Sequence, residues 1–440
     1  MNYIESSKEL LEFIKKSSSM FHTVDTVKSY LDNENFVELK EGESWNLEKG
    51  KNYYTTRNDP SILAFKVGKN ISDYHYQLVA SHSDSPTFKI KSVAELEGPG
   101  DYIKLNVEVY GGPIDWTWLD KPLTLAGRVL VEENNEIVSK LLYIDKDILI
   151  IPDVAIHMNR EVNSGYKFNR QVDLLPLFTT GAMKKGDYNK MIAEELGVKE
   201  NQIISKDLFL VNRQEGKVWG YKDEFVSSPK LDDLECAFTS LKAFIAASND
   251  VAVNVYACFD NEEAGSNTKQ GAMSTFLKDT LRRINSALGY SEEDYLRAVA
   301  KSFLVSADNA HAVHPNHPEL TDDGNKAFMN KGIVIKEAAN QKYTSDAFSQ
   351  AVFKKICALS EVPVQHFANR SNMQGGSTLG NLSNTQVSLH AVDIGLPQLA
   401  MHSNYETAGV MDVGYMIKAL TKYYNTNIKI QGATKISIEE

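Results

Sequence analysis

Two adjacent glutamates at the end of an apolar run are the residues of this sequence best suited to chemistry. The run Val255–Phe259 carries no charge, and Asp260 and Asn261 separate it from Glu262 and Glu263. Such a run predicts a strand covered on both faces, and open α/β sheets place their sites at the carboxyl ends of such strands. Neighbouring carboxylates on a turning backbone point in different directions, so one can bind a metal ion while the other faces a reacting water. A solvated acidic turn is the alternative for this stretch taken alone.

A second apolar run, Tyr74–Ala80, is followed by a histidine and a carboxylate. His82 and Asp84 are two residues apart, so they lie on the same side of an extended chain. Metal-binding histidines commonly donate their other ring N–H to a carboxylate, which makes Asp84 a candidate partner of a ligand His82. The alternative is a polar turn in which Asp84 caps the segment that follows.

Three more stretches place a carboxylate or a histidine at a strand end or a helix start. Asp232 and Asp233 stand at the start of a helical pattern, where one of them could be the N-cap and the other could bind a metal ion. Asp308 follows an apolar run, and His402 precedes a helical stretch. Two divalent ions need about this many ligands if one carboxylate bridges them, and Glu262 then remains as a general base. Mixed histidine and carboxylate ligands without cysteine favour zinc, manganese or cobalt over a structural thiolate site. The candidate ligands are His82, Asp232, Glu263, Asp308 and His402.

The elements that must position these residues predict an α/β protein. Apolar runs and helical patterns succeed one another in the first and last parts of the chain, which predicts a mixed sheet with helices on both faces. The expected strands include residues 61–67, 74–80, 255–259, 303–307 and 387–394, and the expected helices include residues 1–19, 234–245 and 414–424.

The middle of the chain has a different pattern. Alternating residues at 103–110, 123–131 and 137–144, with glycine pairs and asparagines between them, predict antiparallel strands. We therefore expect a catalytic domain formed by residues 1–91 and 226–440, interrupted by a β-rich domain at 92–225. In that domain Gly111-Gly112-Pro113, Trp116 and Trp118 predict either a rigid loop at a subunit contact or part of the domain core.

Composition limits the classes of function. With 440 residues the chain is long enough for two or more domains, because a single hydrophobic core seldom grows this large. Its 47 basic and 58 acidic residues give a net charge of −11, which argues against nucleic acid as a partner. Three scattered cysteines in apolar surroundings suit reduced thiols in the cytoplasm. The amphipathic N-terminus lacks the apolar core of a signal peptide, and no stretch predicts a membrane span.

These motifs resemble, in order and over nearly the whole chain, those of the aspartyl aminopeptidase and vacuolar aminopeptidase family. The resemblance implies a two-zinc exopeptidase that removes N-terminal residues from peptides. It also implies a catalytic α/β domain split by an inserted oligomerisation domain, and assembly as a tetrahedral homododecamer. The matching stretches are 81–86, 231–234, 260–266, 306–316 and 401–403, with intervening blocks at 110–112, 123–128, 155–157 and 159–160.

Carried over position by position, the resemblance assigns a role to each candidate. Asp232 would bridge two metals that the other four candidate ligands complete, and a metal-bridging water would lose its proton to Glu262 and attack the first peptide carbonyl. Asp84 would orient His82, and His157 would reach the active site of a neighbouring subunit. The remaining candidates for substrate binding are His311, Gly376, Ser377 and Lys336.

Alternatives remain for the preferred substrate and for the reaction itself. Lys336 matches a family lysine associated with acidic substrates, and an ammonium in a pocket would favour an N-terminal Asp or Glu; a solvated lysine at a strand end is the alternative. Relatives often carry Asp at the position of Asn372 and Asn at that of Asp233. A neutral-residue aminopeptidase is therefore an alternative. So are a metal deacylase, a carboxypeptidase with a clamp at Arg370 or Lys336, and a binding protein without turnover, against which the intact Glu262 argues.

Overall fold

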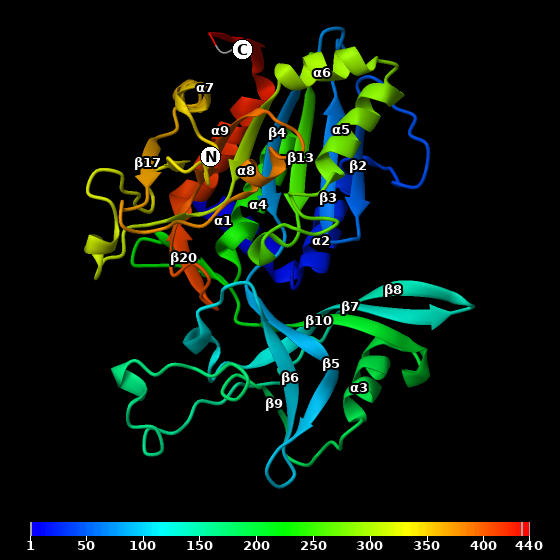
Figure 1. The fold of residues 1–440 in the computed structure, drawn as a ribbon, viewed down its shortest axis with the longest axis vertical. Helices are drawn as coiled ribbons and strands as arrows, with labels where there is room; N and C mark the ends of the chain where they lie inside the picture. Colours follow the sequence, from blue (N-terminus) through cyan, green and yellow to red (C-terminus); the bar gives the residue numbers. More distant parts are fainter. Residues whose placement is uncertain (1, 433, 440) are drawn as a thin grey trace.

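The computed structural model describes residues 2–432 and 434–439, and its largest element is a nine-stranded mixed sheet (Figure 1). Neighbours β13, β4, β14 and β18 run parallel, whereas β3 and β16 pair antiparallel with β13 and β18. The expected mixed sheet is thus confirmed. Its order is β1 (Val37–Glu38), β2 (Asn52–Arg57), β3 (Ser61–Val67), β13 (Val253–Phe259), β4 (Tyr76–His82), β14 (Phe303–Ala307), β18 (His390–Gly395), β16 (Ile333–Glu337) and β17 (Val364–Ala368).

The central strands of this sheet are covered on both faces, as the uncharged runs predict. Every residue of β4, β13 and β14 is buried. The expected strands at 61–67 and 303–307 coincide with β3 and β14, while β4 begins two residues later than predicted and β18 begins three residues later. Because these parallel strands are adjacent, their carboxyl ends meet at one edge of the sheet.

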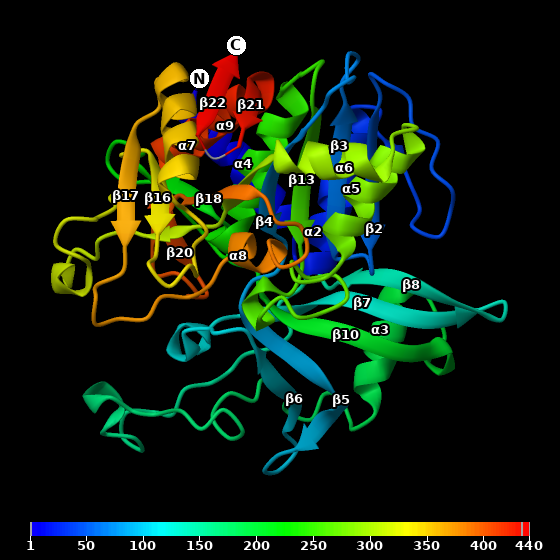
Figure 2. The ribbon, with the colours of Figure 1, turned by 45° about the horizontal axis from the view of Figure 1, so that its top comes forward.

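Helices cover both faces of the sheet, as expected (Figures 1 and 2). The predicted N-terminal helix is α1, although Met1 lies outside the described residues, and the predicted helix at 414–424 lies within α9. One face packs against α1 (Tyr3–Lys16), α2 (Met20–Asn33), α4 (Leu231–Ala246), α7 (Ala347–Leu359) and α9 (Val410–Asn425). The other packs against α5 (Phe276–Ala287), α6 (Glu292–Ala300) and α8 (Leu379–Ser383).

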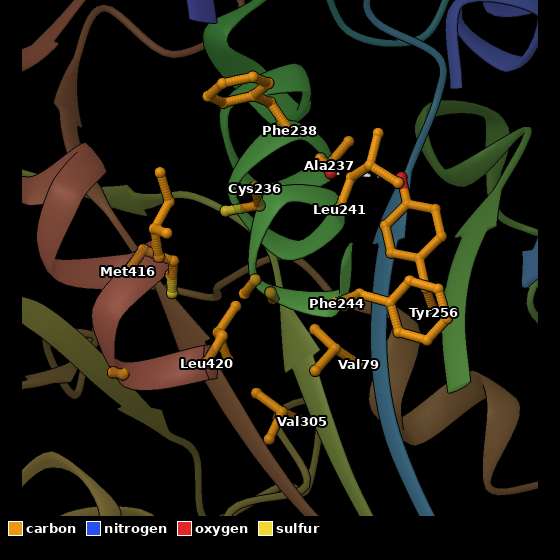
Figure 3. Close-up of a cluster of buried hydrophobic side chains, with 14 of the residues drawn as sticks. Val79, Cys236, Ala237, Phe238, Leu241, Phe244, Tyr256, Val305, Met416 and Leu420 are labelled. Carbon is orange, nitrogen blue, oxygen red and sulfur yellow. Dashed lines mark hydrogen bonds between the residues drawn. The ribbon is translucent and has the colours of Figure 1, made fainter. Parts of the chain in front are cut away.

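Helix α4 fits between the sheet and α9. Its apolar residues Phe238, Leu241 and Phe244 recur at three-residue steps, so they share one face, and all are fully buried. Figure 3 shows them among Val79 of β4, Tyr256 of β13, Val305 of β14, and Met416 and Leu420 of α9. This packing fixes the helix whose first residues reach the site.

A six-stranded antiparallel sheet with its own apolar core lies beside the larger one (Figure 1). The predicted strands at 103–110, 123–131 and 137–144 are confirmed by β6, β7 and β8. The domain boundaries at 92 and 225 stay a prediction, and the first strand of this sheet begins at residue 87. The order is β8 (Glu136–Tyr143), β7 (Leu123–Glu133), β10 (Ile203–Asn212), β5 (Thr87–Glu97), β6 (Ile103–Tyr110) and β9 (Leu177–Thr179), with α3 (Asp187–Leu196) alongside.

The two tryptophans of the loop after β6 behave differently. Trp118 is buried in the core of the six-stranded sheet, as one reading of the sequence has it, whereas Trp116 is 67% exposed. The three cysteines are buried and free, as their apolar surroundings predict. No helix in the described part of the chain is long and apolar enough to cross a membrane.

A third sheet joins short strands from the second half of the chain to two that follow the six-stranded sheet. Its order is β11 (Lys217–Trp219), β12 (Phe225–Ser228), β20 (Glu406–Gly409), β19 (Pro397–Leu399) and β15 (Ala310–His311). A hairpin of β21 (Asn427–Gln431) and β22 (Lys435–Glu439) ends the described chain. Short 3-10 helices are η1 (Asp115–Trp118), η2 (Val162–Ser164), η3 (Glu200–Gln202), η4 (Glu262–Ala264) and η5 (Pro318–Leu320).

The packing of α4 yields a stability prediction. Phe244→Ala removes a fully buried ring, so we expect it to lower the free energy of unfolding by about 3–5 kcal/mol. Ile245→Ala, on the same helix but only partly buried, is the matched control and should cost clearly less. Urea unfolding followed by circular dichroism measures both, and equal losses would contradict this account of the packing.

Candidate metal centre

The ends of three adjacent strands bring the candidate histidine and carboxylates together. His82 is the last residue of β4, Asp308 directly follows β14, and Glu262 and Glu263 lie in η4 just after β13. Asp232 reaches the same place from the start of α4. Neither Asp232 nor Asp233 caps that helix through its side chain: Asp233 Oδ2 accepts the backbone N–H of His82 at 3.1 Å, and Oδ1 of both residues accepts no hydrogen bond from the described residues. The N-cap alternative is therefore wrong.

Two groups of potential ligands share Asp232. Its Oδ1 lies 3.4 Å from Nε2 of His82, and its Oδ2 lies 3.4 Å from Nε2 of His402. The same nitrogen of His402 is 3.5 Å from Oε2 of Glu263. Two ligand atoms bound tetrahedrally to one zinc ion are about 3.4 Å apart, given Zn–N and Zn–O bonds of about 2.0–2.1 Å. Asp308 and Asp233 join the group around His82, with ligand atoms within 4.8 Å of one another.

Buried oxygens without partners mark the same place. Asp232 Oδ1, Asp233 Oδ1 and Glu263 Oε1 are buried and accept no hydrogen bond from the described residues. Leaving such oxygens unpaired is costly, and a divalent cation among them removes the cost. Histidine nitrogens and carboxylate oxygens without a thiolate are a donor set that zinc accepts. The residues present thus fit a zinc site.

The pKa values of these groups reflect burial first and the neighbouring charges second. Burial raises the pKa of Glu262 to about 8, with the Asp308 carboxylate adding to the effect and His82 opposing it. Burial raises the pKa of Glu263 well above its ordinary value. Burial disfavours the charged form of His402, but the neighbouring carboxylates of Asp232 and Glu263 outweigh it and raise its pKa to about 10. A cation bound here would replace the protons that the cluster otherwise retains.

Asp84 ties the strand ends to one another. Its Oδ1 accepts the backbone N–H of Glu262 at 3.2 Å, and its Oδ2 accepts the backbone N–H of Glu263 at 3.1 Å and the Tyr110 hydroxyl at 2.7 Å. Asp84 also lies beside His82, whose Nδ1 is 3.4 Å from Asp84 Oδ1 and 3.1 Å from the Asp84 carbonyl oxygen. Its carboxylate thus fixes the η4 turn as well as contacting the histidine ring.

The segment after β6 reaches the cluster from the six-stranded sheet. Gly111 has φ +73°, and a Cβ there would lie 3.0 Å from the Cβ of Glu263. The carbonyl oxygen of Gly112 accepts a hydrogen bond from Nδ1 of His402 at 3.0 Å, which leaves Nε2 facing Asp232. The two glycines, which the sequence assigns to a rigid loop, therefore support the site.

Glu406 was not identified from the sequence. It is 1% exposed; its Oε2 accepts the backbone N–H of Asp232 at 3.0 Å, and its Oε1 accepts that of His402 at 2.7 Å. The Glu406 carboxylate thus fixes the backbone of Asp232 and of His402, two of the three potential ligands in the group that includes Glu263. The available signal was a carboxylate at the start of an otherwise uncharged strand, Glu406–Gly409.

A cavity of about 410 Å³ opens over the cluster. His157 does not line it, because it is exposed in the long segment between β8 and β9, and Asn372 is exposed and does not line it either. Its walls include the five candidate ligands His82, Asp232, Glu263, Asp308 and His402, the candidate base Glu262, and the substrate-binding candidates His311, Lys336, Gly376 and Ser377.

Lys336 is not a solvated lysine, so that alternative is wrong. It is 2% exposed, and its Nζ donates to the carbonyl oxygens of Asp308 at 2.8 Å and Asn309 at 3.2 Å. The Asp308 carboxylate lies 3.7 Å away. Burial opposes the charge, but Asp308 raises the pKa of Lys336, so the cavity wall carries an ammonium.

An α/β body that gathers histidines and carboxylates at its strand ends defines a metal-dependent hydrolase. Comparison with known families is more specific, because the model for aminopeptidase I zinc metalloprotease (M18) matches residues 13–424. The chain belongs to the M18 family and is a zinc metalloaminopeptidase. The family that the sequence motifs resemble is thereby confirmed.

Individual relatives agree with this assignment. The chain is 49% identical over 430 residues to the probable M18 family aminopeptidase 2 of Clostridium novyi (strain NT), covering 96% of this chain and 99% of that protein. It superposes on a chain of the Ape4 and Nbr1 complex with a TM-score of 0.92 and 33% identity, covering 96% and 86% of the two chains. For the S. cerevisiae mApe1 dodecamer the TM-score is 0.85 and the identity 27%, covering 96% and 97%.

The contacts of Glu406 yield a prediction about zinc affinity. In Glu406→Gln the side-chain NH₂ cannot accept a hydrogen bond, so one of the two backbone N–H groups loses its acceptor. We expect zinc affinity to fall about 10- to 100-fold. The matched control, Glu361→Gln, changes a side chain that is 89% exposed and should leave the affinity unchanged. Competition with a colorimetric chelator measures both, and wild-type affinity in Glu406→Gln would contradict this role.

Proposed function

We propose that this aminopeptidase releases the N-terminal residue of peptides by hydrolysis, with Glu262 as the general base. The observation that carries the proposal is the position of Glu262, which lines the cavity and belongs to neither of the two ligand groups that share Asp232; its own potential group is His82 and Glu263. The Glu262 carboxylate lines the cavity over the cluster, so it can accept a proton from a water molecule there and return it to the leaving group.

In the proposed site, five side chains would hold two zinc ions. His82 and Asp308 would hold one, Glu263 and His402 the other, and Asp232 would bridge them with its two oxygens; the 3.4 Å contacts on either side of Asp232 support this division. Zinc bound there would lower the pKa of a water molecule and polarise a carbonyl group. Cobalt or manganese could replace zinc with the same donor set.

The remaining steps belong to side chains of the chain itself. Glu262 accepts the proton of the attacking water and returns it to the nitrogen of the departing peptide. Asp84 holds Glu262 and Glu263 through their backbone N–H groups, which keeps the base in position. Backbone N–H groups near Gly376 and Ser377, which line the cavity, would orient the peptide.

The role of the base yields a prediction. Glu262→Gln keeps the shape of the side chain but cannot accept a proton, so we expect kcat to fall by about 10²- to 10⁴-fold while bound zinc is retained. Peptides beginning with Glu, Asp, Leu or Lys, with free or acetylated N-termini, provide the assay, and Glu293→Gln at an exposed position is the control. Cleavage of acetylated peptides alone, or from the C-terminal end, would instead indicate the deacylase or carboxypeptidase alternative.

We propose further that the enzyme prefers acidic N-terminal residues. The support is the ammonium of Lys336 in the cavity wall, which would attract a substrate carboxylate. Its two hydrogen bonds to backbone carbonyls also position Asp308, so the lysine serves the site in two ways.

A substitution separates these two uses of Lys336. Lys336→Met removes the charge at similar length, and we expect the ratio of kcat/KM for Glu-first over Leu-first peptides to fall about tenfold or more, because about 1.4 kcal/mol of attraction is lost. Lys222→Met, at an exposed position, should leave the ratio unchanged. An unchanged ratio with lower rates for both peptides would assign Lys336 to positioning Asp308 alone.

Assembly as a tetrahedral homododecamer is the last part of the proposal. The support is the likeness to the S. cerevisiae mApe1 dodecamer and the exposure of Trp116 and Met158 in the region predicted to form subunit contacts. In such an assembly His157 would reach a neighbouring active site.

Three buried free thiols support a cytoplasmic location.

A further inference from the structure

A second cavity adjoins the catalytic one. The two share His311, Phe367 and Gly376 in their walls, so they lie side by side. The second cavity continues past Arg370 and Met373 and away from the metal cluster. For a peptide whose N-terminal residue is held at the cluster, this cavity is neighbouring space for the residues that follow.

The shared wall contains an unpaired strand edge. β15 is the last strand of its sheet, and within the described residues no strand pairs with its outer side. Ala310 and Ala312 donate their backbone N–H groups to Leu396 and Gln398 of the neighbouring chain segment, each at 2.8 Å. The N–H and C=O of His311 between them therefore face the other way, because backbone groups alternate in direction along a strand. An extended peptide can pair with such an edge.

A cation that forms no ion pair with the described residues lies farther along the same cavity; the Glu319 carboxylate interacts with it only at longer range and lies 3.0 Å from Nδ1 of His317. Arg370 donates from Nη1 to the carbonyl oxygen of Glu319 at 2.5 Å, and no carboxylate of the described residues forms an ion pair with it. The carboxylate that lines this cavity, Asp322, is engaged elsewhere. It accepts the backbone N–H groups of Gly324 at 3.0 Å and Asn325 at 2.8 Å. The fork of Arg370 is thus held in place with donors to spare.

We propose that the downstream part of the peptide pairs with the outer edge of β15 and presents a carboxylate to Arg370. The carboxylate is either the free C-terminus of a short peptide or an acidic side chain of a longer one. Short peptides with a free C-terminus and peptides with an acidic residue downstream are then the preferred substrates. This inference rests on the proposed aminopeptidase function and adds a second point of recognition, remote from the first residue.

Peptides of increasing length test the Arg370 contact. The set has one favourable first residue followed by one to four alanines, each as the free acid and as the C-terminal amide, at low salt. We expect kcat/KM of the acid to exceed that of the amide about three- to tenfold at one length or more, through a lower KM, because a charge-assisted hydrogen bond is gained. In Arg370→Gln the acid-to-amide ratio should fall to about one. Because it is a ratio, partial loss of folded enzyme does not affect it.

The matched control is Arg282→Gln, the same substitution at an exposed residue of α5, which should keep the wild-type ratio. Replacing the last alanine by Glu, Gln or Lys in amidated peptides distinguishes the two sources of carboxylate, since Glu should restore the preference and Lys should oppose it. A ratio of one for the wild-type enzyme at every length and with every last residue would overturn the proposal.

Methylated peptides test the strand edge. Methylation of the backbone nitrogen downstream of the cleaved bond, one position at a time, should raise KM at the position that pairs with the His311 carbonyl. Equal KM values at all positions would overturn the pairing with β15. Failure of the aminopeptidase assignment would look different, because no peptide of any length would then release its first residue.

Discussion

The structure depends on the crowding of buried carboxylates around two histidines. Carboxyl groups that share a buried site cannot all be ionised unless a cation offsets their negative charge; otherwise some of them keep their protons. Here the pKa shifts of Glu262 and Glu263 have burial as their largest cause, and unpaired oxygens remain on Asp232 and Glu263. Zinc bound among these side chains would satisfy them. The acidic members are Asp84, Asp232, Asp233, Glu262, Glu263 and Asp308.

Both bodies of the protein contribute to this site. The nine-stranded sheet supplies the three strand ends, and the packing of α4 against α9 fixes the segment that carries Asp232. The six-stranded sheet supplies the hydroxyl of Tyr110 to Asp84 and the carbonyl of Gly112 to His402. The second sheet is therefore part of the site's support, and a change in its position relative to the larger sheet would move the ring of His402.

The sequence predicts what depends on local pattern. Uncharged runs identify β13, β4 and β14, and polar residues just past them identify His82, Glu262, Glu263 and Asp308. Contacts between distant segments have no such pattern. Glu406 is 174 residues from Asp232, and its place at the start of an uncharged strand does not show in the sequence which backbone N–H groups it accepts. Lys336 likewise reads as a strand-end lysine, because only the fold shows Asp308 beside it.

Anomalous diffraction at the zinc edge, from crystals of the enzyme grown with zinc, tests the central claim most directly. The account predicts two zinc peaks in each subunit, one beside His82 and one beside His402, with the Asp232 carboxylate between them. A single peak would contradict the bridging role of Asp232. Zinc peaks elsewhere, with the cluster free of metal, would contradict the account as a whole.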